Sequence, residues 1–297
     1  MPSLANHQSN EYTKMLVEGD SSSGKTGGLT PLVAAGYKLR ILDMDNGLDP
    51  LKTFVMKQCP DMIGNVEFRT LRDNYEASAT GPKIAKPKAF VEALKMLDHW
   101  KYDDIDLGKP ADWGPEVILV IDSLTFLSDA AFDWAKGINP TAKDPRQWYG
   151  SAQEAIESVL ALLTSPSFKT NVIVISHIKY VDNPDGSRKG YPTSVGSALS
   201  PVIPRYFNSV ALCQTGAGGK RTIQTASTAM IDLKNPKPFD MAKSYPLATG
   251  LAEFFGVLRG APKEASITDG PTRSGLPKFN EKPPEKPLGV KPALKRV

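Results

Sequence analysis

Eight consecutive residues, Gly19–Thr26, constrain the fold of this chain more than any other feature. They match the pattern G-x-x-x-x-G-K-[ST] and follow the short apolar run Met15–Val17. In this pattern the glycines let the backbone curl so that amide groups face phosphate oxygens, the lysine neutralises the β- and γ-phosphates, and the last hydroxyl ligates Mg²⁺. A helix starting near Gly24 adds its positive N-terminal end. The sequence therefore predicts a phosphate-binding loop (P-loop) for a nucleoside triphosphate, formed by Gly19, Asp20, Ser21, Ser22, Ser23, Gly24, Lys25 and Thr26.

An acidic residue that suits such a loop follows a later apolar run. Val117–Ile121 reads Val-Ile-Leu-Val-Ile and is followed directly by Asp122. A continuous apolar run rich in β-branched residues is typical of a strand buried on both faces of a parallel sheet. Because ligands bind at the carboxyl ends of such strands, we expect Asp122 and Thr26 to hold Mg²⁺, the aspartate through water. The alternative is that Asp122 only caps the helix that follows.

Predicted strands and helices alternate along the chain, which indicates an α/β fold with three layers and a mostly parallel central sheet. The helix after the P-loop contains Gly27, Gly28 and Pro31, so we expect it to be kinked or shortened. Exposed loops are expected at 136–147 and 179–197. The expected strands are 13–18, 37–42, 66–71, 117–121, 171–176, 208–214, 220–226 and 229–233, and the other expected helices are 48–58, 87–100, 124–134 and 151–163.

Composition limits the class of protein and its surroundings. The chain has 297 residues, 40% hydrophobic and 8% aromatic, as is ordinary for a globular protein. No segment approaches the roughly 20 apolar residues that cross a bilayer, and residues 1–10 lack the apolar core of a signal peptide. The two cysteines, Cys59 and Cys213, form no C-x-x-C pair, which predicts no disulfide framework or zinc site and fits a reducing cytoplasm.

The net charge of +4 lies at the C-terminal end. Residues 261–297 contain eight Lys or Arg, four Asp or Glu and seven prolines, and they have few large apolar side chains. Such a segment buries too little surface to offset chain entropy, so we expect a disordered basic tail. It either increases solubility or tethers a nucleic acid or another partner. The expected organisation is a flexible N-terminus at 1–10, an ATPase domain at 11–260 and the tail.

Several of these segments together resemble the RecA-type ATPases, from about Met15 to Phe239. Ile41–Pro50 is similar to the family's strand that ends in an acidic residue and a Leu-Asp-Pro turn, and Val117–Ser123 resembles its Walker B segment. The resemblance implies a RecA-like P-loop NTPase core that hydrolyses ATP with Mg²⁺. On it, Asp45 falls on the glutamate that activates the attacking water. Asp43 is the next candidate for that role.

Two further segments extend the resemblance. Asn171–Ile178 looks like the family's strand that ends in a switch residue, which senses the γ-phosphate and is usually Gln; here it is His177. The alternative for His177 is an ordinary hydrogen-bonded residue at a strand end. Leu233–Phe239 resembles a segment whose lysines, here Lys234 and Lys237, reach the γ-phosphate of a neighbouring subunit, which implies a homo-oligomeric ring or filament.

A core-only chain with Ser-His-Ile at 176–178 is most similar to the phage RecA-like single-strand annealing proteins of the Sak group. This resemblance implies a host-cytoplasmic protein that binds single-stranded DNA and promotes annealing and recombination, with a single-strand DNA-binding protein as a further expected partner and no membrane. Basic and aromatic residues alternate in two loops, 136–148 and 179–197, as suits contacts to phosphates and bases. Lys179, Arg188 and Lys189 of the second loop are the expected DNA contacts, although solvated loops also collect charge without a role.

Two other functions fit the same motifs. One is a nucleotide-dependent regulator or assembly protein that ignores DNA. The other is a ring helicase or motor, for which an arginine finger is expected. No arginine is clearly placed by the sequence for that role.

Overall fold

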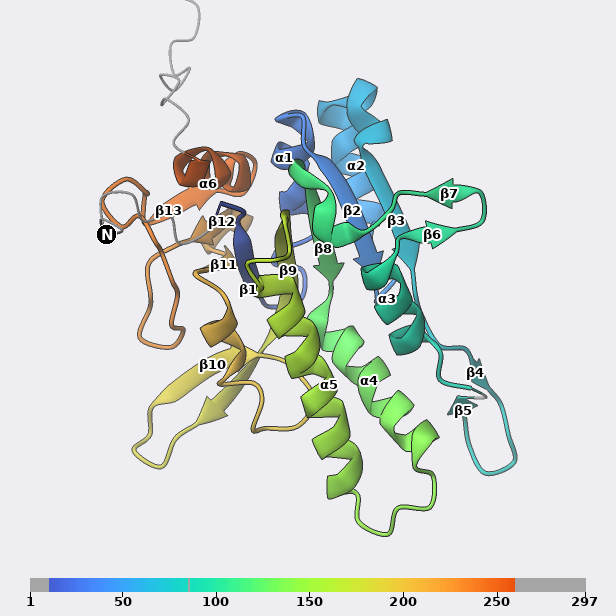
Figure 1. Ribbon diagram of the computed structural model, residues 1–297. Helices are drawn as coiled ribbons and strands as arrows, with labels where there is room; N and C mark the ends of the chain where they lie inside the picture. The colour runs from blue at the N-terminus through green and yellow to red at the C-terminus, as the bar shows by residue number, and fades with distance from the viewer. Residues whose placement is uncertain (1–10, 85, 260–297) are drawn as a thin grey trace, which may run out of the picture. The chain divides into compact units, whose positions relative to one another are not determined.

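The computed structural model describes residues 11–84 and 86–259 and is built on a nine-stranded sheet. Its strand order is β13-β12-β11-β1-β9-β8-β2-β3, with β10 paired to β9 (Figure 1). The strands from β11 to β3 run parallel, and β10, β12 and β13 run antiparallel to their neighbours. The bounds are β1 Lys14–Gly19, β2 Lys38–Asp43, β3 Val66–Thr70, β8 Gly114–Asp122, β9 Thr170–Asp182, β10 Arg188–Pro192, β11 Ser209–Thr215, β12 Arg221–Gln224 and β13 Ser244–Pro246.

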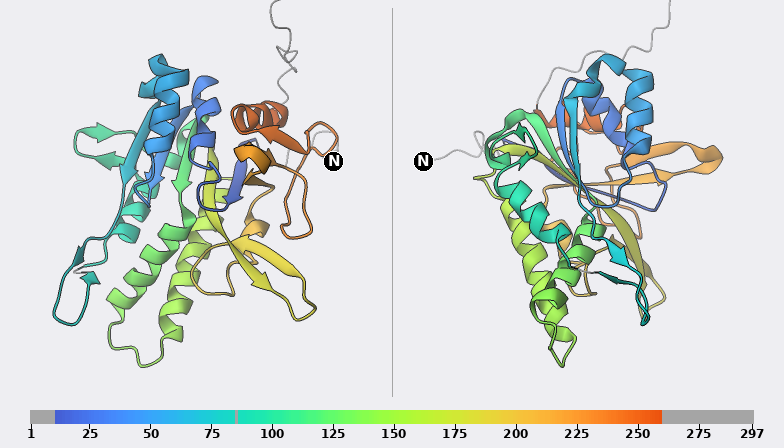
Figure 2. Two further views of the ribbon diagram at one scale, coloured as in Figure 1. Left: turned by 180° about the vertical axis from the view of Figure 1, so that it is seen from behind. Right: turned by 90° about the vertical axis from the view of Figure 1, so that its right-hand side faces the viewer.

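Helices cover both faces of this sheet, which confirms the predicted three-layer α/β fold (Figure 2). One face carries α1 (Thr30–Ala34), α2 (Asp49–Gln58) and α6 (Gly250–Arg259), and the other carries α3 (Ala89–Asp98), α4 (Leu124–Ile138) and α5 (Arg146–Thr164). Two small hairpins are separate from the sheet: β4 (Tyr75–Glu76) with β5 (Lys83–Ile84), and β6 (Lys101–Tyr102) with β7 (Ile105–Asp106). Short 3-10 helices are Gly27–Leu29, Pro60–Asn65, Pro110–Asp112, Ile203–Tyr206 and Ala217–Gly219.

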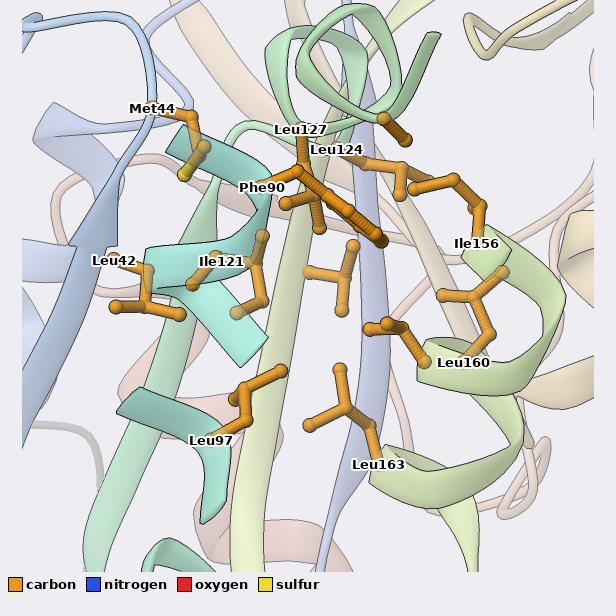
Figure 3. Packing of buried hydrophobic residues seen from close by; sticks show 14 of the residues in the cluster. Leu42, Met44, Phe90, Leu97, Ile121, Leu124, Leu127, Ile156, Leu160 and Leu163 are labelled. Carbon is orange, nitrogen blue, oxygen red and sulfur yellow. The ribbon is translucent and has the colours of Figure 1, made fainter. Parts of the chain in front are cut away.

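Side chains of the buried strands alternate between two apolar cores. In β8, Leu119 and Ile121 face α3, α4 and α5, whereas Ile118 and Val120 face α1, α2 and α6. Figure 3 shows the first core, in which Ile121 lies among side chains from several helices. Because successive side chains of a strand point to opposite faces, an uninterrupted apolar run is what a doubly covered strand requires.

The segment after the P-loop has no long helix, as its glycines and proline predict. A 3-10 turn at Gly27–Leu29 leads into the five-residue α1. The structure also shows why two glycines occur there. A Cβ atom on Gly27 would lie 2.7 Å from Cε2 of Phe54, and one on Gly28 would lie 2.9 Å from Cδ1 of Leu247. The glycines therefore let neighbouring elements approach this segment closely.

Two secondary-structure predictions were wrong. The segment 179–197 is not a loop throughout, because β9 continues to Asp182 and pairs with β10 in a hairpin. Its turn holds Pro184, Asp185 and Gly186, and Gly186 has φ 80°. The predicted strand 229–233 is also absent from the described residues; this stretch meets the sheet only through a bridge between Val210 and Lys234, and β13 forms the edge instead.

The two helices that flank the expected loop at 136–147 are longer than expected. α4 continues to Ile138 and α5 begins at Arg146, so the connection between them is short. No helix within residues 11–84 and 86–259 has the length and hydrophobicity that crossing a membrane requires. The predicted flexible N-terminus at 1–10 and the basic tail at 261–297 lie outside the described residues and stay predictions.

Candidate active site

The sheet brings the predicted catalytic segments together at the carboxyl ends of its parallel strands. In the register of the parallel strands, Gly19 at the end of β1 pairs with His177 of β9, and Asp43 at the end of β2 pairs with Asp122 of β8. Because β9 lies between β1 and β8, the P-loop, His177 and Asp122 follow one another along the carboxyl ends of neighbouring strands. Ligands bind at this position in open α/β sheets.

The side chain of Lys25 folds back and binds the backbone of the P-loop. Its Nζ donates hydrogen bonds to the carbonyl oxygens of Gly19, at 2.9 Å, and Asp20, at 2.8 Å. Burial lowers the pKa of Lys25, while the negative charges of Asp122, Asp20 and Asp45 oppose that shift. Gly24 holds the turn with φ 96°, a conformation that a residue with a side chain adopts only with strain. The ammonium group thus lies at the loop, where phosphate oxygens would be stronger acceptors than carbonyls.

Thr26 and Asp122, the two residues predicted to hold Mg²⁺, are hydrogen-bonded to each other. The Thr26 hydroxyl donates to Oδ2 of Asp122 at 2.7 Å. Burial raises the pKa of Asp122 to about 7; the charges of Asp45 and Asp43 add to the shift, and the bond from Thr26 opposes it. The positive charge of Lys25 also acts on this buried carboxylate and lowers its pKa, but less than burial raises it. This all-oxygen donor set fits Mg²⁺, which commonly binds one or two protein ligands and completes its shell with phosphate oxygens and water.

Asp43 and Asp45 differ in their hydrogen bonding. Asp43 accepts a bond from the Thr70 hydroxyl at 2.7 Å and another from the Gly47 amide at 3.2 Å, so both of its oxygens hold the local chain. Oδ1 of Asp45 is buried and has no hydrogen-bond partner within residues 11–84 and 86–259. Burial raises the pKa of Asp45, and the nearby charge of Asp43 raises it further. Asp43 thus uses both of its oxygens within the described residues, whereas Asp45 has one oxygen whose hydrogen-bonding capacity they leave unused.

His177 is anchored by a residue that the sequence prediction missed. Its backbone amide donates to the Thr125 hydroxyl at 3.2 Å, and its Nδ1 lies 3.3 Å from the same oxygen. The ring of Phe126 meets the imidazole edge-on at 6.3 Å. Burial lowers the pKa of His177, and the charge of Lys25 lowers it further, so the neutral imidazole is favoured beside the P-loop. Thr125 lies three residues after Asp122, a spacing that gives no signal by itself.

The two predicted trans-acting lysines make contacts inside the chain. Lys234 donates from Nζ to the carbonyl oxygens of Pro204, at 2.7 Å, and Phe207, at 3.1 Å. Lys237 donates to the carbonyl oxygen of Val257 at 2.7 Å. Both ammonium groups would have to release these carbonyls before they could reach the phosphate of a neighbouring subunit.

The predicted DNA contacts lie on the β9–β10 hairpin, which is drawn in yellow beside α5 in Figures 1 and 2. Arg188 lies 3.4 Å from the carboxylate of Asp182, and Lys189 lies 3.0 Å from that of Asp232. Lys179 is exposed and lines an open groove of about 590 Å³. The other lining residues come from the start of α5 and the segment after β10: Arg146, Tyr149, Gly150, Gln153, Ser194, Gly196, Ser197 and Ala198. The groove is thus lined by residues of both segments that were expected to contact DNA, 136–148 and 179–197.

A buried carboxylate next to the P-loop had no signal in the sequence. Glu18 of β1 is 1% exposed, and neither of its side-chain oxygens has a hydrogen-bond partner among the described residues. Burial raises the pKa of Glu18 to about 8 from its ordinary value of 4.5. The folded protein therefore binds this proton more tightly than the unfolded chain does, and Glu18 lowers stability as the pH rises from about 4.5 to 8.

We expect the Glu18→Gln variant to be more stable than the wild type at pH 8, by about 2–4 kcal/mol, because one pKa unit corresponds to about 1.4 kcal/mol. At pH 4.5 the difference should be small, since the carboxyl group is then protonated in the folded protein. Denaturant unfolding at the two pH values measures this, with the exposed Glu154→Gln as the matched control. Equal stability of Glu18→Gln and wild type at pH 8 would show that the buried charge has no cost.

Comparison with known proteins identifies the protein family to which this chain belongs. The AAA domain family matches residues 11–236, so the chain belongs to this family. With its P-loop and parallel sheet, the chain is a P-loop ATPase with a RecA-like fold. No curated protein matches the sequence.

Among solved structures, the RadB recombinase is 14% identical with a TM-score of 0.39, over 71% of this chain and 79% of that one. A prototypical ATPase from the type III secretion system of pathogenic bacteria is 13% identical with a TM-score of 0.41, over 67% of this chain and 51% of that one. The ATPase EscN from enteropathogenic E. coli, in complex with its central stalk EscO, is 13% identical with a TM-score of 0.40, over 74% of this chain and 48% of that one.

Proposed function

We propose that this P-loop ATPase hydrolyses ATP with Mg²⁺ and binds single-stranded DNA, and that it promotes annealing and homologous recombination. The observation that carries the hydrolytic part is the hydrogen bond between Thr26 and Asp122 at 2.7 Å, near an Asp45 oxygen that has no partner in the described part of the chain. The DNA-binding part rests on the resemblance to RecA-type proteins and on the groove that holds Arg146, Tyr149 and Lys179.

In this proposal each residue contributes positioning or charge, as is typical of phosphoryl transfer. Lys25 exchanges its two backbone carbonyls for the β- and γ-phosphates. Thr26 and Asp122 would hold Mg²⁺, which neutralises the phosphate charge when bound. Asp45 orients the attacking water with its carboxylate. His177, neutral and anchored by Thr125, donates a hydrogen bond toward the γ-phosphate and connects it with the hairpin that follows in the chain.

We also propose a homo-oligomeric ring or filament in which Lys234 and Lys237 complete the site of a neighbouring subunit. Lys234 donates to two carbonyl oxygens of its own chain and Lys237 to one, so assembly would exchange those bonds for bonds to phosphate. One observation favours a second function, the nucleotide-dependent regulator without DNA activity. Arg188 and Lys189 already have carboxylate partners, which reduces their attraction for a phosphate backbone.

DNA binding through the hairpin and groove predicts a specific salt dependence. Each phosphate of a single strand that a cation neutralises releases about 0.7 counterion. We expect Lys179→Ala to flatten the plot of log affinity against log salt concentration by roughly 0.7, and the double variant Arg188→Ala/Lys189→Ala by roughly 1.4. Fluorescence anisotropy with labelled oligonucleotides at several salt concentrations measures the slope. The exposed Lys57 of α2, on the opposite face of the sheet, gives the control Lys57→Ala.

Deleting residues 261–297 tests the competing idea that the basic tail binds DNA. ATP should strengthen binding through the hairpin, because His177 leads into it, and leave binding through the tail unchanged. If the deletion abolishes DNA binding while the hairpin variants keep the wild-type slope, the hairpin is not the DNA contact and the regulator function is favoured.

A further inference from the structure

An edge hairpin of the sheet lies directly against the P-loop. β12 and β13 pair at the end of the sheet beyond β11 (Figure 1). A Cβ atom added to Gly24 would lie 2.5 Å from Cδ2 of Leu247 and 3.0 Å from Cδ of Arg221. Leu247 also approaches Gly28, and its amide donates to the carbonyl oxygen of Arg221 at 3.1 Å. Arg221 and Leu247 therefore lie together beside Gly24 of the loop, and Leu247 also lies beside Gly28 in the turn that follows it.

The strand order fixes which end of a nucleotide would meet this hairpin. The groups that suit the metal and the terminal phosphates are Asp122 on β8 and Asp45 after β2, on one side of β1. β12 and β13 lie on the other side of β1, beyond β11. A triphosphate that follows the P-loop with its γ-phosphate toward Asp122 would therefore carry its nucleoside toward β12 and β13.

The chemistry of the two side chains suits an aromatic base. Arg221 is exposed and makes no ion pair with a carboxylate among the described residues. A guanidinium group is planar and stacks on aromatic rings, which an ammonium group cannot do in the same way. Leu247 is half-buried and offers an apolar contact at the same place.

We infer that Arg221 and Leu247 form the nucleobase subsite of this ATPase, in which the guanidinium group stacks on the purine base of ATP. The inference rests on the proposed nucleotide site and adds the residues that recognise the base. The sequence gives no signal for it, because Arg221 follows a glycine-rich turn far from the P-loop in the chain.

The test compares ATP with inorganic tripolyphosphate, which has the phosphates and no base. We expect Arg221→Ala to weaken ATP binding about 3- to 30-fold, the range of a cation–π contact, and to change tripolyphosphate binding less than twofold. Arg221→Lys keeps a charge that can still lie over a ring but loses the planar group that stacks on it, so it should recover only part of the ATP affinity that Arg221→Ala loses. The adjacent exposed Lys220→Ala is the control and should bind both ligands as the wild type does. Titration calorimetry with Mg²⁺ gives the dissociation constants when each protein also carries Asp45→Asn, which is expected to keep ATP bound and suppress turnover, and thermal unfolding confirms that the variants are folded.

Two results would overturn the inference. Unchanged ATP affinity in Arg221→Ala would mean that the side chain makes no contact with the nucleotide. An equal loss for ATP and tripolyphosphate, with ATP affinity fully rescued in Arg221→Lys, would mean that the cation contacts phosphates and not the base. Failure of the proposed nucleotide site is distinct from both, because the wild-type protein would then bind neither ligand.

Discussion

Replacing Lys25 by alanine should lower ATP turnover by about 100-fold or more, because the variant loses the cation that stabilises charge on the transferred phosphate. Lys25 is the one basic side chain in Gly19–Thr26, and it is 6% exposed. Its charge therefore acts in a poorly solvated place, where electrostatic stabilisation is larger than in water. Steady-state phosphate release measures the turnover, and binding of a fluorescent ATP analogue measures the affinity.

The Lys25→Ala variant also leaves two carbonyl oxygens, those of Gly19 and Asp20, without their donor. An unsatisfied buried acceptor costs about 1–3 kcal/mol, so the melting temperature is measured in parallel. Lys57→Ala, an exposed substitution on α2, is the control for removal of a positive charge. Wild-type turnover in a folded Lys25→Ala variant would show that this loop does not hold the reacting nucleotide.

Replacing Asp45 by asparagine should lower the rate of hydrolysis by about 100- to 10,000-fold, the usual contribution of a positioned base, and leave ATP bound. The asparagine has nearly the same shape, but it cannot accept a proton from water. Asp122→Asn should behave differently, because it removes a proposed metal ligand and should raise the Mg²⁺ concentration needed for half-maximal activity. Rates measured across a Mg²⁺ titration separate the two roles.

The Asp43→Asn variant tests whether Asp45 or Asp43 activates the attacking water. Asp43 lies two residues away and uses both oxygens in bonds to Thr70 and Gly47. We expect this variant to lose stability and to retain more hydrolytic activity than Asp45→Asn. If Asp45→Asn hydrolyses ATP normally while Asp43→Asn does not, the water-activating role belongs to Asp43.

The fold, and the position of the site at the carboxyl ends of the strands, could be predicted because both depend on short sequence patterns. Uninterrupted apolar runs such as Val117–Ile121 occur in strands that are covered on both faces. Once such strands run parallel, the residues after them meet at one edge, which places Asp122 and His177 beside the P-loop without further information. The short helix after the loop followed in the same way from Gly27, Gly28 and Pro31.

The remaining features depend on contacts between distant segments. The β9–β10 hairpin was missed although Asn183–Gly186 reads Asn-Pro-Asp-Gly, a turn signal that the polar, charged surroundings obscured. Thr125, Arg221 and Leu247 gain their places by the packing of the sheet, and no spacing in the sequence connects them with the P-loop. Glu18 reads as an ordinary strand end, and only the covering of β1 by other segments buries it.

The most direct measurement of the central claim is phosphate release from ATP by the wild-type protein and by Lys25→Ala, each with and without single-stranded DNA. We expect Mg²⁺-dependent hydrolysis by the wild type, a faster rate when single-stranded DNA is present, and loss of both in Lys25→Ala. Hydrolysis that ignores DNA would contradict the proposed recombination function and favour a regulator. Absence of any hydrolysis, or equal hydrolysis by the two proteins, would contradict the assignment of Gly19–Thr26 and Asp45 as the catalytic site.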